Sequence, residues 1–477
     1  MFLDLELRRE SGVIVLLVVA ACITGLVYLT NDFLTKRKTS TVVRRTSAPS
    51  QAKPGGSEKD NYTTAFPPLH KSCFSDPSPG VAEVKVVDLA STSKPLVPLN
   101  SDYRQCEPWL FNFTGFSIAD IRSLGNFPDY AKLSGVPLPA PLVDFDVDKA
   151  LPRPYRPFRW AYHQTMSLSK MDVDFWIELE KTYRARVIQR QDLFRENGTH
   201  VLESLPGSEL ACKELMEMVL QFLVARYPNQ YKLEGYILIN KILNTETDLS
   251  KMAPLEVLLN NVPEDFGIML RDPETGRYVL RAGVICSSVG WKLSEKMGMG
   301  LPGIHTHVPD YKEKMELSMD RFFTKMPTDK PIQRGSWGLE VGQPLFIPAE
   351  HPDFAHRSTQ NPTLRPEDVY LRVDWQTLRR LPLSGAIVFN FKALFTPMTE
   401  FKSEPYVPSL LLKVLDEGKE NIMKYKGTWH VQHVAKPTLR EYQRFQVETG
   451  MMENEWTVQT LAEAPFFRGW EKKWRYC

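Results

Sequence analysis

Hydrophobic residues follow three patterns along the chain, and each pattern predicts a different kind of structure. Residues 12–29, GVIVLLVVAACITGLVYL, carry no charge and are long enough to cross the roughly 30 Å hydrocarbon layer of a membrane as one helix. Residues 39–94 are rich in Ser, Thr, Pro and Gly, and they bury too little apolar surface to fold. Periodic patterns begin near Cys106 or Trp109. The sequence therefore predicts four regions: a membrane anchor over 1–35, a disordered stalk over 36–105, a folded domain over 106–440 and a C-terminal tail over 441–477.

Two segments of the folded domain have the hydrophobic period of an α-helix. The first, SLSKMDVDFWIELEKTYRARVIQRQDLF, offers Ser169 as its N-cap. The apolar residues of its stripe recur at four-residue spacing: Phe175, Leu179, Tyr183 and Val187. The second helix is expected to begin at Ser208 and to end before Pro228, because the residue preceding a proline disfavours helical geometry. We expect both stripes to lie in the core.

Alternating apolar and polar residues predict β-structure in the centre of the chain. Residues 266–270 and 278–286 flank RDPETGR, a turn sequence, which predicts a hairpin. The segment VYLRVDWQ, at 369–376, alternates strictly, and residues 384–395, SGAIVFNFKALF, predict a second strand beside it. These patterns predict an α+β fold in which helices cover an antiparallel sheet.

Charge and cysteine content exclude several classes of protein. The 59 Lys and Arg residues are almost balanced by 57 Asp and Glu residues, so the composition does not predict nucleic-acid binding. The six cysteines have no CxxC spacing, which disfavours a zinc ribbon or a dense disulfide framework. What remains is a folded domain without a compositional signature of its partner.

Charges near the apolar run predict on which side of the membrane the domain lies. Residues 36–45 contain five basic side chains, which favour a single-pass protein whose body is cytosolic, at an endomembrane such as the endoplasmic reticulum. The sequons at Asn61, Asn112 and Asn197 argue for the opposite side. Small residues at 20–22 leave a cleaved signal peptide as an alternative to an anchor.

The segment GIHTHVPDY contains the leading candidate for chemistry, the pair His305 and His307. In an extended segment alternate side chains point to the same side, so the pair could bind a metal ion together with Asp310 or Glu313. A single imidazole in an apolar cavity could instead bind the iron of a haem. An ordinary polar turn is the third interpretation.

Three other motifs have weaker support. GMGLPG, residues 298–303, matches the letters of a dinucleotide-binding motif, but it lacks the preceding strand and contains a proline. Cys286 could act as a nucleophile with His305 as its base, although neither lies in a recognisable nucleophile motif. The alternating aspartates of VDFDVDKA (Asp144, Asp146, Asp148) lie in a proline-rich stretch. They and the anchor leave a lumenal glycosyltransferase as a minor alternative.

Several runs, in order, resemble one family. WKLSEKMGMGLPGIHTHVPDYKEKMELSMDRFF, IQRGSWGLE, YLRVDWQTLRRLPLSGAIVFNFKALF and IMKYKG are similar to the haem-dependent oxidative N-demethylase alpha-subunit family, which includes fungal proteins. The resemblance extends from about Trp109 to Arg440 and implies a PAS-like fold that holds haem b. It also implies oxidation of a small secondary methylamine by O₂, which releases the primary amine and formaldehyde. Electrons would come from NADPH through a separate flavin and iron–sulfur reductase.

The resemblance also implies which residues hold the haem. His305 matches the family's I-H-x-x-V-P segment and is the expected iron ligand. The family's basic segment corresponds to four residues here that are expected to bind the cofactor: Arg372, Gln376, Arg379 and Arg380. Guanidinium groups suit propionates, but ordinary ion pairs at the sheet edge are an equal alternative for these arginines. Trp291 and Trp337 are candidates to line the cavity, although packing in the hydrophobic core is the more common role of an aromatic side chain.

Departures from the family pattern leave the activity open. His307 stands where the family often has a proline, so it could replace His305 as the ligand, and Asp374-Trp375 stands where the family has Glu-Arg. Haem binding could survive such changes while turnover of dimethylamine is lost. A PAS-like sensor that binds haem or another small ligand without turnover is therefore the main alternative to an enzyme.

Overall fold

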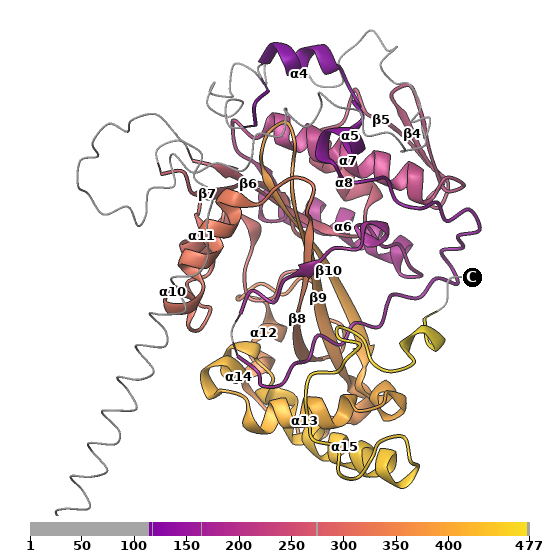
Figure 1. Cartoon of the computed structure of the whole chain (residues 1–477), viewed down its shortest axis with the longest axis vertical. Helices are drawn as coiled ribbons and strands as arrows, with labels where there is room; N and C mark the ends of the chain where they lie inside the picture. Colours follow the sequence, from indigo (N-terminus) through magenta and orange to yellow (C-terminus); the bar gives the residue numbers. More distant parts are fainter. Residues whose placement is uncertain (1–113, 117, 164, 273–274, 475–477) are drawn as a thin grey trace, which may run out of the picture. The chain divides into compact units, whose positions relative to one another are not determined.

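The computed structural model describes residues 114–116, 118–163, 165–272 and 275–474 (Figure 1). The anchor and stalk expected over 1–105 lie outside these ranges and stay predictions. Within the described ranges, no helix combines the length and the apolar character that a membrane crossing requires.

A seven-stranded antiparallel sheet forms the centre of the fold, in the order β1-β8-β9-β10-β6-β7-β2. Its strands are β1 (Ser169–Lys170), β2 (Leu202–Ser204), β6 (Asp265–Arg271), β7 (Tyr278–Val284), β8 (Ile332–Val341), β9 (Val369–Arg380) and β10 (Ile387–Pro397). The two hairpins expected from alternation are both present, because β6 pairs with β7 and β9 pairs with β10. A mixed α+β fold with an antiparallel sheet is thus confirmed. A separate three-stranded sheet contains β3 (Tyr231–Glu234), β4 (Ile237–Asn240) and β5 (Thr245–Asp248).

Helices cover the sheet in three groups (Figure 1). The first group is α4 (Ile118–Leu124), α5 (Tyr130–Ser134), α6 (Tyr183–Asn197), α7 (Glu209–Arg226) and α8 (Pro254–Asn261). The second group is α9 (Leu301–Ile304), α10 (Tyr311–Lys314) and α11 (Glu316–Lys325). The third is α12 (Pro352–Ala355), α13 (Val407–Glu417), α14 (Glu420–Lys426) and α15 (Trp429–Glu448).

Alternation along the strands assigns side chains to two different hydrophobic clusters. On β10, Val388 belongs to the cluster that includes the buried residues of α7 and α8. Its neighbour Ile387 belongs to the cluster that includes Met315 and Met319 beside α11. Successive side chains of a strand point to opposite faces, so these helices lie on opposite faces of the sheet. The face toward α9–α11 is the one that carries the cavity described below.

The two predicted helices had different outcomes. The helix expected from Ser208 is confirmed as α7. The helix expected from Ser169 was wrong at its start, because α6 begins at Tyr183. Ser169 instead pairs with Gln333 as part of the edge strand β1. Residues 176–180 are all buried, as in a segment enclosed from every side, and periodicity alone cannot distinguish such a segment from a helix.

The chain beyond α15 packs back onto the same body. The backbone of Trp160 donates to the Thr460 hydroxyl at 3.0 Å, and Arg156 donates through its backbone to Pro465 O at 2.5 Å. The Arg156 guanidinium also forms two hydrogen bonds with buried Glu404, at 2.7 and 2.6 Å. The described part of the segment expected as a tail is therefore joined to the wall that carries residues 157–163.

Candidate functional site

A cavity of about 380 Å³ lies against the sheet face that carries α9–α11. Its size falls within the range of roughly 300–1,000 Å³ that is typical of small-molecule sites. Residues of β6, β8, β9 and β10 form its floor, and segment 157–167 forms one wall. Its apolar lining consists mainly of Met269, Leu280, Ile285, Trp291, Leu293, Leu301, Ile304, Val308, Met315, Met319, Trp337, Phe389 and Phe391. The lining includes both candidate tryptophans, Trp291 and Trp337.

His305 contributes an imidazole to this cavity from the C-terminal end of α9. Its Nδ1 lies 2.8 Å from Leu301 O and donates to it, because a carbonyl oxygen can only accept. This bond fixes the tautomer in which Nε2 carries the free lone pair. The ring is also stacked on Tyr311, with 4.9 Å between centroids and 5° between planes. The imidazole is therefore held in one orientation with one nitrogen left to bind a ligand.

Burial keeps this imidazole neutral. Desolvation, reinforced by the positive charges of Lys296 and Arg334 and opposed by the bond to Leu301 O, lowers the pKa of His305 to about 4. Neutral imidazole is the form that coordinates metals. At pH 7 no proton would have to leave His305 before it could bind iron.

The second histidine of the pair does not share this environment. His305 caps α9 in a turn rather than in an extended segment, so the expectation that both imidazoles point to the same side is wrong. His307 is exposed and does not line the cavity, and Asp310 is bound by Lys314 and Lys419. Within the described ranges, no group of three or more His, Cys, Asp or Glu residues could hold a metal ion. A two-histidine metal site therefore has no support.

Three cations line the part of the cavity formed by β8, α14 and residues 157–163. Arg334 on β8 has a buried Nε without a hydrogen-bond partner among the described residues. Lys426, at the end of α14, contacts Ser336 Oγ at 3.2 Å and lies 5.3 Å from the centre of the Trp337 ring. Both residues are half-buried and line the cavity. We call Arg334 and Lys426 the basic end, and Arg159 lies close to it.

The charge of the basic end is poorly compensated. Burial, reinforced by Arg334, lowers the pKa of Lys426 to about 7, although Asp374 opposes the shift. Among the described residues, the lining has four Lys or Arg side chains, the fourth being Lys296, and no Asp or Glu. Buried cations need a partner, so this lining indicates an anionic ligand.

Of the four residues expected in the basic segment, only Gln376 lines the cavity. Arg372 is paired with Asp374 at 2.9 Å and donates to Pro344 O at 2.8 Å. Arg379 points to the opposite face of β9, where its guanidinium lies 4.1 Å from the centre of the Trp176 ring. Arg380 is sealed beneath α11 and donates to the carbonyls of Met326, Phe323, Thr324 and Gly385 and to the Tyr278 hydroxyl. The structure does not bring these three arginines together at the cavity.

The cations at the basic end were missed in the sequence, although a signal was present. Arg334 belongs to IQRGSWGLE and Lys426 to IMKYKG, two of the runs that carry the family resemblance. The departure Asp374-Trp375 lies outside the lining, and Trp375 is stacked on Tyr155 at 3.8 Å on the other face of β9. That departure therefore does not alter the cavity wall.

The minor motifs have no comparable environment. Burial raises the pKa of Cys286 to about 12, which disfavours a thiolate nucleophile. The glycine-rich segment 298–303 runs into α9, a helix of only four residues, so it cannot present the helix N-terminus that a dinucleotide site requires. Asp146 and Asp148 are exposed and paired with Lys149 and Arg184.

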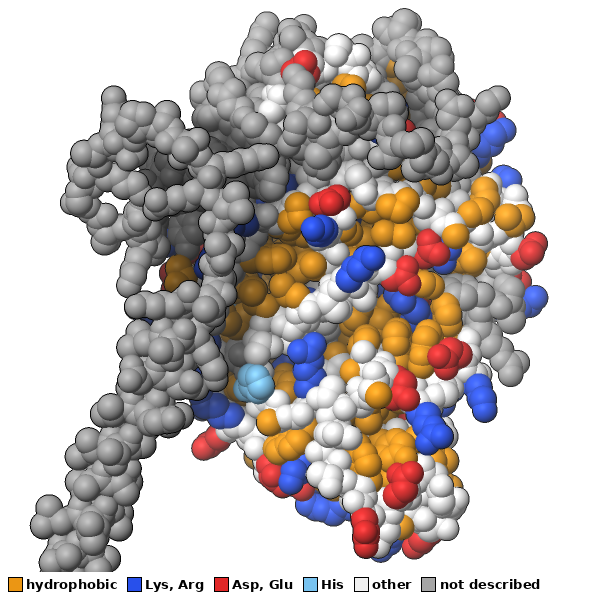
Figure 2. All heavy atoms as spheres, in the orientation of Figure 1, with side chains coloured by type: hydrophobic (Ala, Val, Ile, Leu, Met, Phe, Trp, Pro, Cys, Tyr) orange, Lys and Arg blue, Asp and Glu red, His pale blue; other side chains and the backbone are white. Residues whose placement is uncertain are grey.

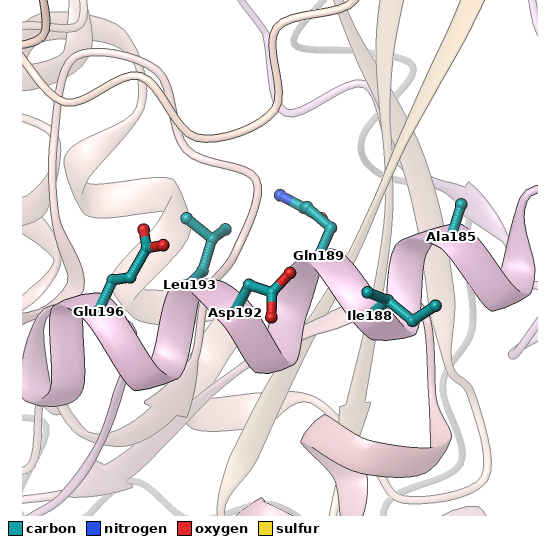
Figure 3. A pocket seen from close by; sticks show the side chains of 6 residues that line it. All are labelled: Ala185, Ile188, Gln189, Asp192, Leu193 and Glu196. Carbon is teal, nitrogen blue, oxygen red and sulfur yellow. The ribbon is translucent and has the colours of Figure 1, made fainter.

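A second hollow, on the outer side of α6, is open rather than enclosed. Figure 3 shows its lining along one helix face: Ala185, Ile188, Gln189, Asp192, Leu193 and Glu196. These residues offer carboxylates and no cation, so the hollow does not suit an anionic cofactor. On the face drawn in Figure 2, basic and acidic side chains are interspersed over the described surface rather than gathered in one area.

The lining combines apolar walls, a neutral imidazole and uncompensated cations, which suits a mostly apolar ligand with an acidic edge. Residues 167–436 match the family model described as haem-dependent oxidative N-demethylase, alpha subunit-like. This match covers more than half of the chain, so the chain belongs to this family.

The residues of the cavity fit the cofactor that the family name implies. Haem b needs an apolar cavity, an axial ligand and cations for its propionates. His305 provides a neutral imidazole with a free Nε2, and Arg334 provides a buried donor that lacks an acceptor. Each requirement is thus met by a side chain that faces the same cavity.

Proposed function

We propose that the protein is a PAS-like haem monooxygenase that removes a methyl group from an N-methylated amine. The observation that carries the proposal is the cavity with neutral His305 and with Arg334 Nε, which has no hydrogen-bond partner in the described part of the chain. The balanced reaction consumes the methylamine, O₂, two electrons and two protons, and it yields the demethylated amine, formaldehyde and water. Haem, when bound, would supply the activation of O₂.

The residues of the chain would bind and orient the reactants. His305 Nε2 would bind the iron, and Arg334 and Lys426 would hold the propionates. The apolar walls would exclude water from the methyl group. Burial raises the pKa of Tyr162 to about 12, so its hydroxyl would stay protonated and could donate a hydrogen bond toward the bound amine.

The electrons would come from a separate protein. The described residues contain two cysteines, both buried and free, and no group that could hold an iron–sulfur cluster. We therefore propose a flavin and iron–sulfur reductase that uses NADPH. A cytosolic body at an endomembrane, as the charges at 36–45 predict, would be accessible to such a reductase.

The test of this function has two steps. The purified protein, reconstituted with haem, should show a Soret band that shifts on reduction with CO. Addition of NADPH, a generic reductase and candidate methylamines should then release formaldehyde. A protein that takes up no haem would contradict the proposal. Haem uptake without formaldehyde from any methylamine would favour the PAS-like sensor instead.

Replacement of Arg334 by glutamine should weaken haem binding. The change removes a charge-assisted interaction with a propionate, which corresponds to about 10- to 100-fold in affinity. Titration of the apoprotein with haem, followed at the Soret band, measures the effect. The matched control is Arg195→Gln on α6, whose side chain is 73% exposed, and its affinity should equal that of the wild type. Equal affinities for both variants would remove Arg334 from the haem site.

Haem affinity should fall as the pH rises above 7. Lys426 has a pKa of about 7 in the empty cavity, where it faces Arg334, Asp374, Ser336 and the rings of Tyr162 and Trp337. A propionate beside it would raise that pKa, so binding takes up a proton. Haem affinity is then highest below pH 7, where Lys426 is protonated before binding, and it decreases by up to about tenfold per pH unit above pH 7. His305, with a pKa of about 4, cannot cause this dependence. The slope should disappear in Lys426→Met, and a slope that persists would contradict the assignment.

A further inference from the structure

The positive charge of the cavity lining limits which substrates can bind there. The inference about the substrate rests on the proposed function. Four cationic side chains line the cavity, and no carboxylate among the described residues does. The two propionates of haem b could neutralise only two of these cations. A bare methylammonium ion would therefore enter a site that already has excess positive charge, and like charges at short range repel each other strongly in an enclosed site.

The four cations differ in whether they already have a partner or are available to bind a substrate. Lys296 donates to Ile304 O at 2.9 Å and lies 4.9 Å from the centre of the Trp291 ring. Arg334 and Lys426 are half-buried at the basic end, where the propionates are proposed to bind. Arg159 is exposed yet lines the cavity, and it forms no hydrogen bond or ion pair with another described residue. Arg159 is therefore the cation left for a second anion.

The backbone around Arg159 is held firmly in place. Phe158 is buried and packs edge-on against Trp337, with 5.1 Å between ring centroids. On the other side, the Trp160 backbone donates to the Thr460 hydroxyl. Arg159 is also close enough to Tyr162 and Arg334 to affect the pKa values of both. A fixed arginine at the opening, beside the basic end, can bind a carboxylate with both branches of its guanidinium.

We infer that the substrate is an N-methylated amino acid whose carboxylate binds Arg159 at the cavity opening. The carboxylate would offset the excess positive charge that repels a simple amine. The remaining positive field would lower the pKa of the bound amine and favour its neutral form, which has the free lone pair. The cavity would thus select both the class of substrate and its protonation state.

The test compares two ligands that differ only in their charge. N-methylglycine and N-methylglycinamide have nearly the same size, but only the first has a carboxylate. Each is titrated into the haem-loaded full chain, and binding is read from the change in the Soret band without turnover. The wild type should bind N-methylglycine at least about tenfold more tightly than the amide. Dimethylamine should bind more weakly than N-methylglycine.

Two variants link this preference to one side chain. Arg159→Gln should reduce the preference to within about threefold while haem stays bound, and Arg195→Gln should keep the wild-type preference. Equal affinities of the two ligands in the wild type would overturn the inference, as would a preference that survives in Arg159→Gln. In both cases the bound haem would leave the proposed function intact. A protein that binds no haem would overturn the proposed function and this inference together.

Discussion

His305→Ala should lose at least about 100-fold in haem affinity and should lose the spectrum of an imidazole-ligated iron. The substitution removes the ligand itself, whereas loss of an outer partner of a metal ligand typically costs about 10- to 100-fold. Soret titration of the apoprotein and the reduced CO spectrum measure both effects. Because His305 is stacked at the edge of a turn rather than in the core, the variant should still fold.

His307→Ala is the matched control for this experiment. It removes an imidazole two positions away that is exposed and does not line the cavity. Its haem affinity and spectrum should equal those of the wild type. If His307→Ala lost the haem and His305→Ala retained it, the ligand would be His307, as the departure from the family pattern leaves open.

Arg380→Met should lower the free energy of unfolding by about 3–5 kcal/mol without a specific effect on haem binding. The guanidinium is fully buried and donates five hydrogen bonds, four of them to backbone carbonyls. Methionine would leave these acceptors without donors in an apolar environment. Denaturant unfolding of the apoprotein, followed by circular dichroism, measures the loss.

The adjacent arginine provides a control with the opposite expectation. Arg379 is also buried, but it has no ion pair among the described residues, and its Nε has no acceptor. Burial alone lowers its pKa to about 9. Arg379→Met should therefore change stability by less than about 1 kcal/mol, because it removes a costly buried charge. Equal losses in both variants would contradict this division of roles.

Part of the arginine assignment was already accessible from the alternation of β9. Arg372 and Gln376 lie on one face of a strand and Arg379 on the other, so period two separates Arg379 from the cavity. Alternation cannot distinguish Arg380 from Gln376, because the two residues are four positions apart and therefore lie on the same face of β9. Only the packing of α11 over the end of β9 seals Arg380 beneath carbonyl groups while Gln376 stays open to the cavity.

The segment after Ser169 shows the same limit for helices. Its apolar spacing fits a helix, and residues 183–197 do form one. Residues 176–180 are buried because α7 and the central sheet lie against them: Leu179 N donates to the Tyr227 hydroxyl at the end of α7, and Lys392 Nζ on β10 donates to Glu178 O. An apolar pattern indicates which residues are buried, but not whether a helix or an irregular segment buries them. The neighbours that bury them come from distant parts of the chain.

The sequence by itself determined the antiparallel hairpins, α7 and the family, and it named His305 as the expected iron ligand, which stays a prediction. These features depend on local periodicity or on short motifs, which are written in consecutive residues. The tertiary structure decided which cations face the cavity, because Arg159, Arg334 and Lys426 come from three separate segments. The tertiary structure also places no carboxylate of the described residues in the cavity lining. The net positive charge of the cavity therefore arises only when these three segments come together in the fold.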